Sequence, residues 1–167
     1  MKDQLSFYQI NADQLDALPQ RDFLVDRELT GFFERQGSFI DDLWFDAGIA
    51  IGEILPGISS ILGGHVDSLM GRSGNLIQPS GPTIYTTHIP QGDLVMILKS
   101  LGQARRALRG HTDSVNDAQH QRLEQLAQGH PGGSAKLAGH VHQIQRFVEK
   151  GRGKAELMSV YVRWGKR

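Results

Sequence analysis

Histidine is the residue type whose spacing in this 167-residue chain first suggests metal chemistry. His140 and His142 stand two residues apart in the segment GHVHQIQRF, and five of the seven histidines lie between residues 111 and 142. On a strand, residues i and i+2 point to the same face, whereas on a helix they lie about 200° apart and cannot bind one ion. Whether the two histidines form half of a ligand set therefore depends on the backbone of this segment.

The segment is predicted to be a helix that begins near Ser134. At about 100° per residue, its apolar side chains fall within roughly 60° of arc, which is the pattern of a core-facing stripe. The stripe consists of Leu137, Val141, Ile144 and Val148. On this helix His140 lies beside the stripe, near Phe147, and His142 lies on the solvent side. The two imidazoles are therefore expected to diverge.

The other histidines show no spacing that supports a metal site. No pair has the His-x3-His spacing with which a helix chelates one ion, and no His-Glu-x-x-His frame is present. His130 and His140 could still meet in space. We predict surface histidines, a part-buried His140, no metal site and no cofactor.

The Gly-rich segment QGHPGGSAK is a candidate anion site, because it leads into a helix whose free N–H groups carry partial positive charge. The candidate anion-binding residues are Gly132, Gly133, Ser134 and Lys136. In a P-loop, by contrast, Gly-Lys-Ser/Thr follows a strand. A plain helix–helix turn explains the same residues, and we favour that interpretation.

Nucleophilic catalysis finds little support in the sequence. The serines in GRSGN and GISSI miss the Gly-x-Ser-x-Gly elbow of hydrolases. The absence of Cys excludes thiol catalysis, iron–sulfur clusters, cysteine-based zinc fingers and disulfides, and it fits a reducing cytoplasm. We assign no catalytic residue and favour a protein that is not an enzyme.

Length and hydropathy indicate one compact unit outside the membrane. A chain of this size can bury its own core, so residues 1–167 are expected to form a single globular domain. The start of the chain has no apolar signal region, and no stretch approaches the roughly 18 consecutive apolar residues of a membrane span. We therefore expect a cytoplasmic protein.

The zero net charge conceals a division between the two parts of the chain. Residues 1–98 carry 5 Lys and Arg against 13 Asp and Glu, whereas residues 99–167 carry 13 against 5. Such asymmetry can indicate nucleic-acid binding. Except for the cluster EKGRGK, however, the basic residues are scattered, with few aromatic residues among them. These scattered residues are Lys99, Arg105, Arg106, Arg109, Arg122, Lys136 and Arg146. We expect the acidic and basic parts to pack on each other and do not expect nucleic-acid binding.

The hydrophobic pattern predicts an α+β fold, in which a small, mostly antiparallel sheet of N-terminal, middle and C-terminal strands packs with five to seven helices. The predicted strands are residues 5–10, 83–90 and 157–164. The predicted helices are a short one between Asn11 and Pro19, one or two within residues 21–37, residues 38–55, residues 91–104, residues 114–128 and the helix from Ser134.

Finer expectations follow from caps and spacing. Ser38 and Asp41 are expected to cap the helix of residues 38–55, and Ser114 with Asp117 the helix before Gly129. Residues 56–64 should form a helical turn, and residues 67–82 an irregular surface loop. After Pro90, the expected core-facing side chains are Val95, Leu98 and Leu101.

Several motifs in this order resemble a known family. They are the opening SFYQINADQLDAL, the Asp-x-x-Trp of Asp41 to Trp44, ISSILGG, YTTHIPQGDLVMILKSL, and RFVEKGRGKAELMSVYV at the end. Together they resemble the small bacterial YfbM-like family, a domain of unknown function. The chain departs from the family pattern at THIPQGDLV, where an extra residue separates Pro from the helix. The resemblance implies a bacterial α+β domain and brings no established activity.

By elimination, the sequence favours a non-catalytic protein-binding domain, for example a toxin antagonist of the immunity type. The segment DFLVDRELTGFFERQGSFIDDLWFD mixes acidic and aromatic residues, which suits a basic protein partner. The candidate partner-binding residues are Asp26, Glu28, Glu34, Asp41, Asp42 and Asp46. The alternative is a small cytoplasmic enzyme, or an anion- or metal-binding protein that uses the Gly-rich turn and the histidines of residues 111–142.

Overall fold

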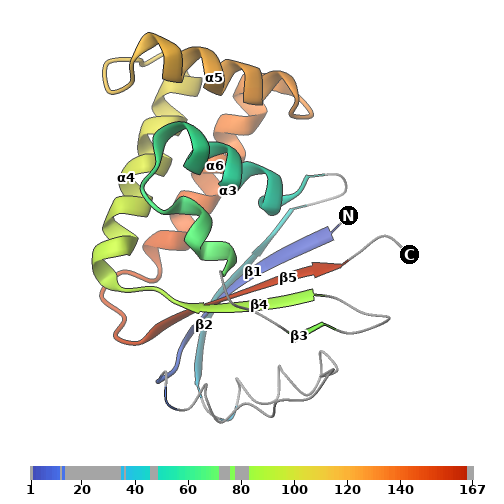
Figure 1. Ribbon diagram of the computed structural model, residues 1–167, viewed down its shortest axis with the longest axis vertical. Coiled ribbons are helices and arrows are strands. Elements are labelled where there is room, and N and C mark those ends of the chain that lie inside the picture. Colours follow the sequence, from blue (N-terminus) through green and yellow to red (C-terminus); the bar gives the residue numbers. More distant parts are fainter. Residues whose placement is uncertain are drawn as a thin grey trace.

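The computed structural model describes residues 2–11, 13, 35, 37–45, 49–71, 76–77 and 83–164. Its strands form one sheet in which every neighbouring pair is antiparallel (Figure 1). The strands are β1 (Lys2–Gln9), β2 (Ser38–Trp44), β3 (Leu76–Ile77), β4 (Thr83–His88) and β5 (Leu157–Trp164). Their order across the sheet is β2-β1-β5-β4-β3. The predicted α+β class, with N-terminal, middle and C-terminal strands side by side, is confirmed.

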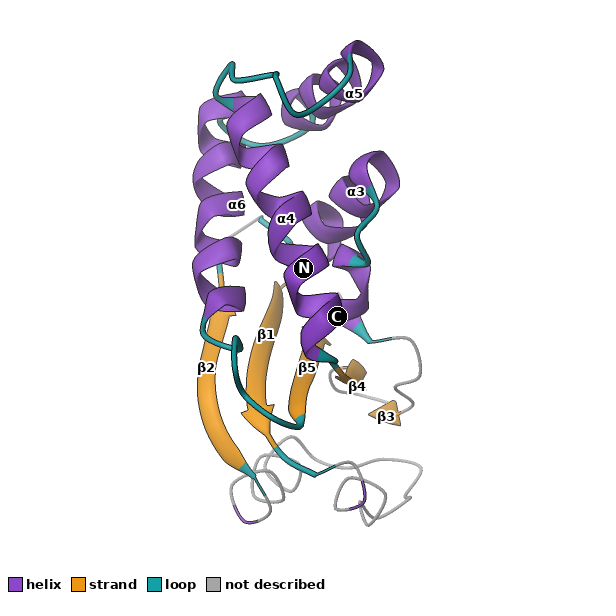
Figure 2. Ribbon diagram, turned by 90° about the vertical axis from the view of Figure 1, so that its left-hand side faces the viewer, coloured by secondary structure: helices purple, strands orange, loops and turns teal. Residues whose placement is uncertain are grey.

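The described residues contain four α-helices, fewer than the five to seven predicted. They are α3 (Ile51–Leu62), α4 (Gln91–Leu108), α5 (Asp117–Gln128) and α6 (Gly133–Glu149), and a 3-10 helix, η1 (Val66–Met70), follows α3. The ring of Phe147 on α6 lies 4.3 Å from that of Phe7 on β1, which places the helices against one face of the sheet. Helices α4 and α6 run side by side, and α5 lies farthest from the sheet (Figures 1 and 2).

The main core lies between this sheet face and the helices. Leu5 and Phe7 of β1 and Leu157 and Tyr161 of β5 join the buried side chains of α3, α4 and α6 there. On the other face of β5, the side chains are buried as well; they are Met158, Val160 and Val162. The sequence predicts one strongly apolar face for this strand. In the structure, side chains on both faces of β5 are buried.

The prediction of a single helix over residues 38–55 is wrong. Residues 38–44 form β2, and α3 begins only at Ile51. The segment has helix-like spacing and a cap-like Ser38, but β1 pairs with one edge of its backbone and sets Leu43 opposite the fully buried Leu5. Tertiary pairing of this kind overrides a local pattern. Ser38 and Asp41 are therefore strand residues and cap no helix.

Helix α3 is capped by a residue from the sheet. The side chain of Asp3 on β1 accepts hydrogen bonds from the backbone N of Ile51 at 2.9 Å and of Gly52 at 2.6 Å. The hydroxyl of Tyr161 on β5 donates to the same carboxylate at 2.9 Å. Burial, followed by the nearby Asp3 carboxylate, raises the pKa of Tyr161 above its ordinary value. One buried carboxylate thus joins β1, β5 and the start of α3.

Residues 56–82 are more regular than expected. Residues 56–62, predicted as a separate turn, continue α3 through Pro56. Within the predicted surface loop, Val66–Met70 forms η1 with Leu69 fully buried, and Leu76–Ile77 pairs with β4 as β3. The loop interpretation is wrong for these residues. Residues 72–75 and 78–82 lie outside the described residues.

The remaining helix predictions are largely confirmed. The apolar stripe of α6 is completely buried, as its spacing indicates. On α4, Leu98 and Leu101 face the core, but Val95 is 52% exposed, so its prediction is wrong. The cap of α5 is Asn116 in a reciprocal capping box with Gln119, and not the predicted Ser114 and Asp117.

The first predicted helices fall mostly outside the described residues. Asn11 accepts a hydrogen bond from the backbone N of Asp13 at 2.8 Å, as an N-cap residue does. Residues 14–34, which contain the rest of these predictions, lie outside the described residues.

Candidate functional site

Strand β2 is an edge strand, and among the described residues no strand pairs with its outer edge. Its register with β1 shifts between Phe7 and Tyr8, which marks a β-bulge in the facing part of β2. The bulge adds one residue to β2 near Ile40 and so changes which of its side chains share a face.

Three exposed side chains lie together on the face of β2 that points away from the helices. In the register, Phe39, Asp42 and Trp44 stand opposite Tyr8, Ser6 and Gln4. These β1 residues alternate with the core residues Leu5 and Phe7, so they belong to the outer face. Phe39 and Trp44 are 54% and 52% exposed, which is unusual for aromatic side chains on a sheet. We call Phe39, Asp42 and Trp44 the β2 outer face.

Contacts with β1 support two of these residues. The ring of Phe39 meets that of Tyr8 edge-on, with centroids 5.5 Å apart. The side-chain amide of Gln4 donates to Asp42 Oδ2 at 3.2 Å. An exposed aromatic ring and an exposed carboxylate are therefore held in place by the neighbouring strand.

The six predicted partner-binding residues fare differently. Asp26, Glu28, Glu34 and Asp46 lie outside the described residues. Asp41 and Asp42 lie in β2, where they point to opposite faces of the strand. They do not lie at the start of a helix, as the predicted helix of residues 38–55 would require. Asp41 forms an ion pair of 2.5 Å with Lys150, at the end of α6. Asp42 has no cationic partner among the described residues.

The predicted anion turn lies at the start of α6. Gly132 is the N-cap residue in the left-handed conformation, with φ of 91°, and it provides no side-chain cap. The Lys136 side chain lies against Gly132 and fills the space that a Cβ at Gly132 would need. Ser134 and Lys136 are exposed. Gly132, Gly133, Ser134 and Lys136 thus come together, but they form a surface turn, as the favoured interpretation predicts.

Two of the clustered histidines meet beside this turn. Nε2 of His130 and Nδ1 of His140 are 2.8 Å apart, so one ring must donate and the other accept. The ring of His140 also packs on Phe45 at 4.7 Å. Burial lowers the pKa of His140, and His130 and Lys136 lower it further. Burial also lowers the pKa of His130, against the opposing effect of Glu53. The predicted part-burial of His140 is confirmed.

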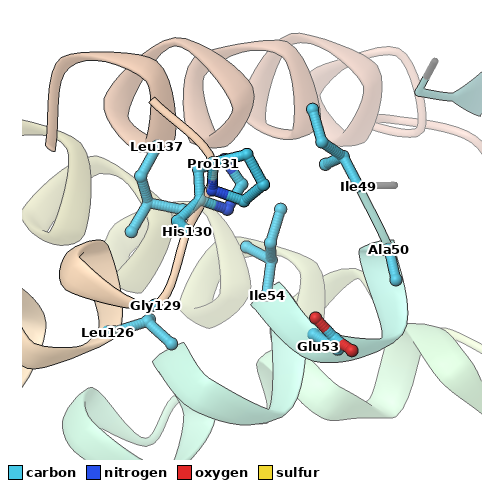
Figure 3. Close-up of a pocket in the computed structure, with 9 residues that line it drawn as sticks. All are labelled: Ile49, Ala50, Glu53, Ile54, Leu126, Gly129, His130, Pro131 and Leu137. Carbon is cyan, nitrogen blue, oxygen red and sulfur yellow. The ribbon is translucent and has the colours of Figure 1, made fainter. Parts of the chain in front are cut away.

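A small cavity opens beside His130, between the start of α3 and the turn before α6 (Figure 3). It is lined by Ile49, Ala50, Glu53, Ile54, Leu126, Gly129, His130, Pro131 and Leu137. Its volume of about 50 Å³ fits a few water molecules. No group of three His, Asp or Glu residues in the described part of the chain could hold a metal ion. We assign this cavity no substrate.

His142 occupies a different environment from His140, as the helical phase predicts. It is half-buried between α6 and α4, where Arg105 Nη1 lies 3.0 Å from its Nδ1. The expectation that it faces only solvent is wrong, because a long arginine side chain from the neighbouring helix reaches over it. Burial lowers the pKa of His142, and so do Arg105, Arg109 and Arg146.

Sequence reasoning missed the β2 outer face, because it treated residues 38–44 as helix. Their bulge places the three residues at spacings of three and two, so neither simple alternation nor helical spacing describes them. The signal that was available is the density of aromatic and β-branched residues in SFIDDLW, which favours a strand.

The described helices include none with the length and apolar character needed to span a membrane. Comparisons of the chain with protein-family models, with curated proteins and with solved structures found no match.

Proposed function

We propose that this chain is a protein-binding domain whose β2 edge accepts an extended, basic segment of a partner protein. The observation that carries the proposal is the β2 outer face, where an exposed carboxylate lies between two exposed aromatic side chains on an edge strand whose outer side pairs with no described strand. An antagonist of a basic bacterial toxin would use such a surface, and a YfbM-like bacterial protein is compatible with it.

The open edge supplies the main-chain part of recognition. An added strand forms hydrogen bonds with the unpaired backbone groups of an edge strand, and pockets or side chains beside it give specificity. Aromatic side chains supply contact area at low entropic cost, and buried aromatic anchors dominate many interfaces. Phe39 and Trp44 can serve as two such anchors, at the two ends of the strand.

Charge determines which strand is accepted. If two copies of this chain paired in antiparallel fashion about Asp42 of β2, the two Asp42 carboxylates would face each other, and like charges directly opposite destabilise a sheet. Acidic residues and a bulge are also devices that protect edges from uncontrolled pairing. A partner that places Lys or Arg opposite Asp42 removes this repulsion, so the edge selects a basic strand.

The proposal can be tested with a short peptide in place of the partner. The ¹⁵N-labelled full chain is titrated with an end-blocked peptide that alternates lysine and valine, and in parallel with a peptide that has glutamate instead of lysine. We expect the lysine peptide alone to shift the backbone amides of Ser38–Trp44 and to slow their exchange with water. Asp42→Lys should abolish this response and admit the glutamate peptide.

Matched variants separate the site from general electrostatics. Asp113→Lys changes the net charge equally at an exposed position away from the sheet, and it should leave lysine-peptide binding unchanged. Trp44→Ala should weaken binding, whereas Val95→Ala, which removes an equally exposed apolar side chain from α4, should not. The proposal is wrong if both peptides bind alike, if Asp42→Lys and Asp113→Lys act alike, or if the shifted amides lie away from β2.

A further inference from the structure

The structure gathers four of the cationic and histidine side chains of residues 105–146 on one surface of the helical layer. Arg105 and Arg109 are four residues apart on α4, and His142 and Arg146 are four apart on α6. Residues at this spacing share a helix face. The two helices run side by side (Figures 1 and 2), and the contact of 3.0 Å between Arg105 Nη1 and His142 Nδ1 joins the two faces. We call these four residues the α4–α6 cluster.

The positive charge of this cluster has no counterpart within the described fold. None of its three arginines forms an ion pair with a carboxylate of the described residues. Arginine side chains are charged at any physiological pH, and besides burial, all three of these arginines lower the pKa of His142. In contrast, Lys150 and Arg152 at the end of α6 are paired with Asp41 and Glu149.

Donor groups in the cluster also lack acceptors. Arginine can only donate, so Nδ1 of His142 must accept, which makes this imidazole neutral with its proton on Nε2. The Nε–H of Arg105 is buried and has no hydrogen-bond partner in the described structure. An unpaired buried donor costs free energy, and a turn of the Arg105 side chain that brings this N–H to a ligand on the surface would recover that cost.

We propose that the α4–α6 cluster is a binding site for a phosphate group, either free phosphate or the phosphate of a small molecule. Donors converge here from two helices, and a tetrahedral phosphate offers acceptor oxygens in several directions, whereas a carboxylate offers two in one plane. Guanidinium forks match phosphate geometry in bidentate fashion. Because α4 and α6 run antiparallel (Figure 1), Arg109 and Arg146 lie one turn from the Arg105–His142 contact in opposite directions, so the cluster is about 12 Å long. It has no Phe, Tyr or Trp among its members, so it suits a small anion better than a nucleic-acid strand, which needs stacking rings and a longer track.

The test titrates the full chain with inorganic phosphate and with tripolyphosphate at constant ionic strength, while NMR follows the imidazole of His142 and the Nε of Arg105. We expect both signals to move, and the pKa of His142 to rise when the anion is bound, because the anion offsets the three arginines. Arg109→Gln should lower the affinity by about tenfold or more, as expected for the loss of a charge-assisted hydrogen bond. Arg105→Gln should do the same.

Arg106→Gln is the matched control, since Arg106 is exposed on the same helix but points about 100° away from Arg105. It should change the affinity by less than about twofold, which is the effect of net charge alone. Equal losses in Arg106→Gln and Arg109→Gln would overturn the proposal, as would unmoved His142 signals. Citrate that binds as tightly as tripolyphosphate would identify a carboxylate site instead. If a single-stranded oligonucleotide binds to the cluster but phosphate and tripolyphosphate do not, the cluster is a nucleic-acid surface and the proposal is wrong.

Discussion

Asp3 is the residue whose loss should reveal most about how this fold is held together. It is 1% exposed, and its carboxylate accepts from Ile51 N, Gly52 N and Tyr161 Oη. Asp3→Ala leaves three buried donors without an acceptor and removes a negative charge from a helix N-terminus. Each donor left unsatisfied costs about 1–3 kcal/mol, so the three together should cost about 3 kcal/mol or more, a large fraction of the roughly 5–15 kcal/mol that stabilises a typical domain.

Two further variants divide that cost. Asp3→Asn keeps one acceptor oxygen but turns an amide NH₂ toward a donor, so we expect a loss of about 2 kcal/mol. Tyr161→Phe removes only the hydroxyl donor and should cost about 1 kcal/mol. The free energy of unfolding is measured by urea denaturation near neutral pH. If Asp3→Ala loses less than about 1 kcal/mol, or no more than Tyr161→Phe, the carboxylate does not hold α3 to the sheet.

Two predictions concern glycine and histidine. Gly63 and Gly64 both have positive φ, of 71° and 77°, but a Cβ at Gly63 meets open space whereas one at Gly64 overlaps Ser100 Oγ. Gly63, with ψ of −143°, lies near the region that only glycine adopts, so Gly63→Ala should cost about 1–3 kcal/mol of backbone strain in thermal unfolding. Gly64→Ala adds the overlap with Ser100 and should cost about 1–3 kcal/mol more than Gly63→Ala, and equal costs would contradict this packing. Because the pKa values of His130 and His140 are lowered in the fold, the unfolded chain takes up protons first as the pH falls through the ordinary value of 6.5, so stability should decrease below about pH 6.5. Replacing both histidines by Gln should reduce this dependence and leave the part that comes from His142, whose pKa is also lowered, and an unchanged slope would exclude the pair as a source.

Predictions from the sequence succeeded where a segment buries one stripe by itself. The stripe of α6 and the β4–α4 unit are local patterns, and the structure confirms both. They failed where a distant segment supplied the missing partner. Residues 38–44 have helix-like spacing, but β1 pairs with them, and Asp3 is an ordinary polar residue in the sequence until α3 lies over it. Neither pairing can be read from the segment itself.

The candidate sites show the same limit in three dimensions. The meeting of His130 and His140 was foreseen only as a possibility, because ten residues and a helix start separate them in the chain. Arg105, Arg109 and Arg146 are scattered in the sequence, yet spacings of four on two helices were present as a signal. The missing information was that α4 and α6 pack side by side.

Among the described residues, only some of the acidic residues of the first part of the chain pair with basic residues of the second part in the folded structure. Asp41 and Lys150 join the acidic and basic parts directly, as expected for parts that pack on each other. Asp42 on the β2 outer face and the arginines of the α4–α6 cluster have opposite charges, lie on different elements, and form no ion pair within the described residues. The two proposals thus assign a basic segment to the sheet edge and an anion to the helices of a chain with zero net charge. Because both attractions act at exposed charges, both should weaken as salt is raised, and the two sites should respond to it independently.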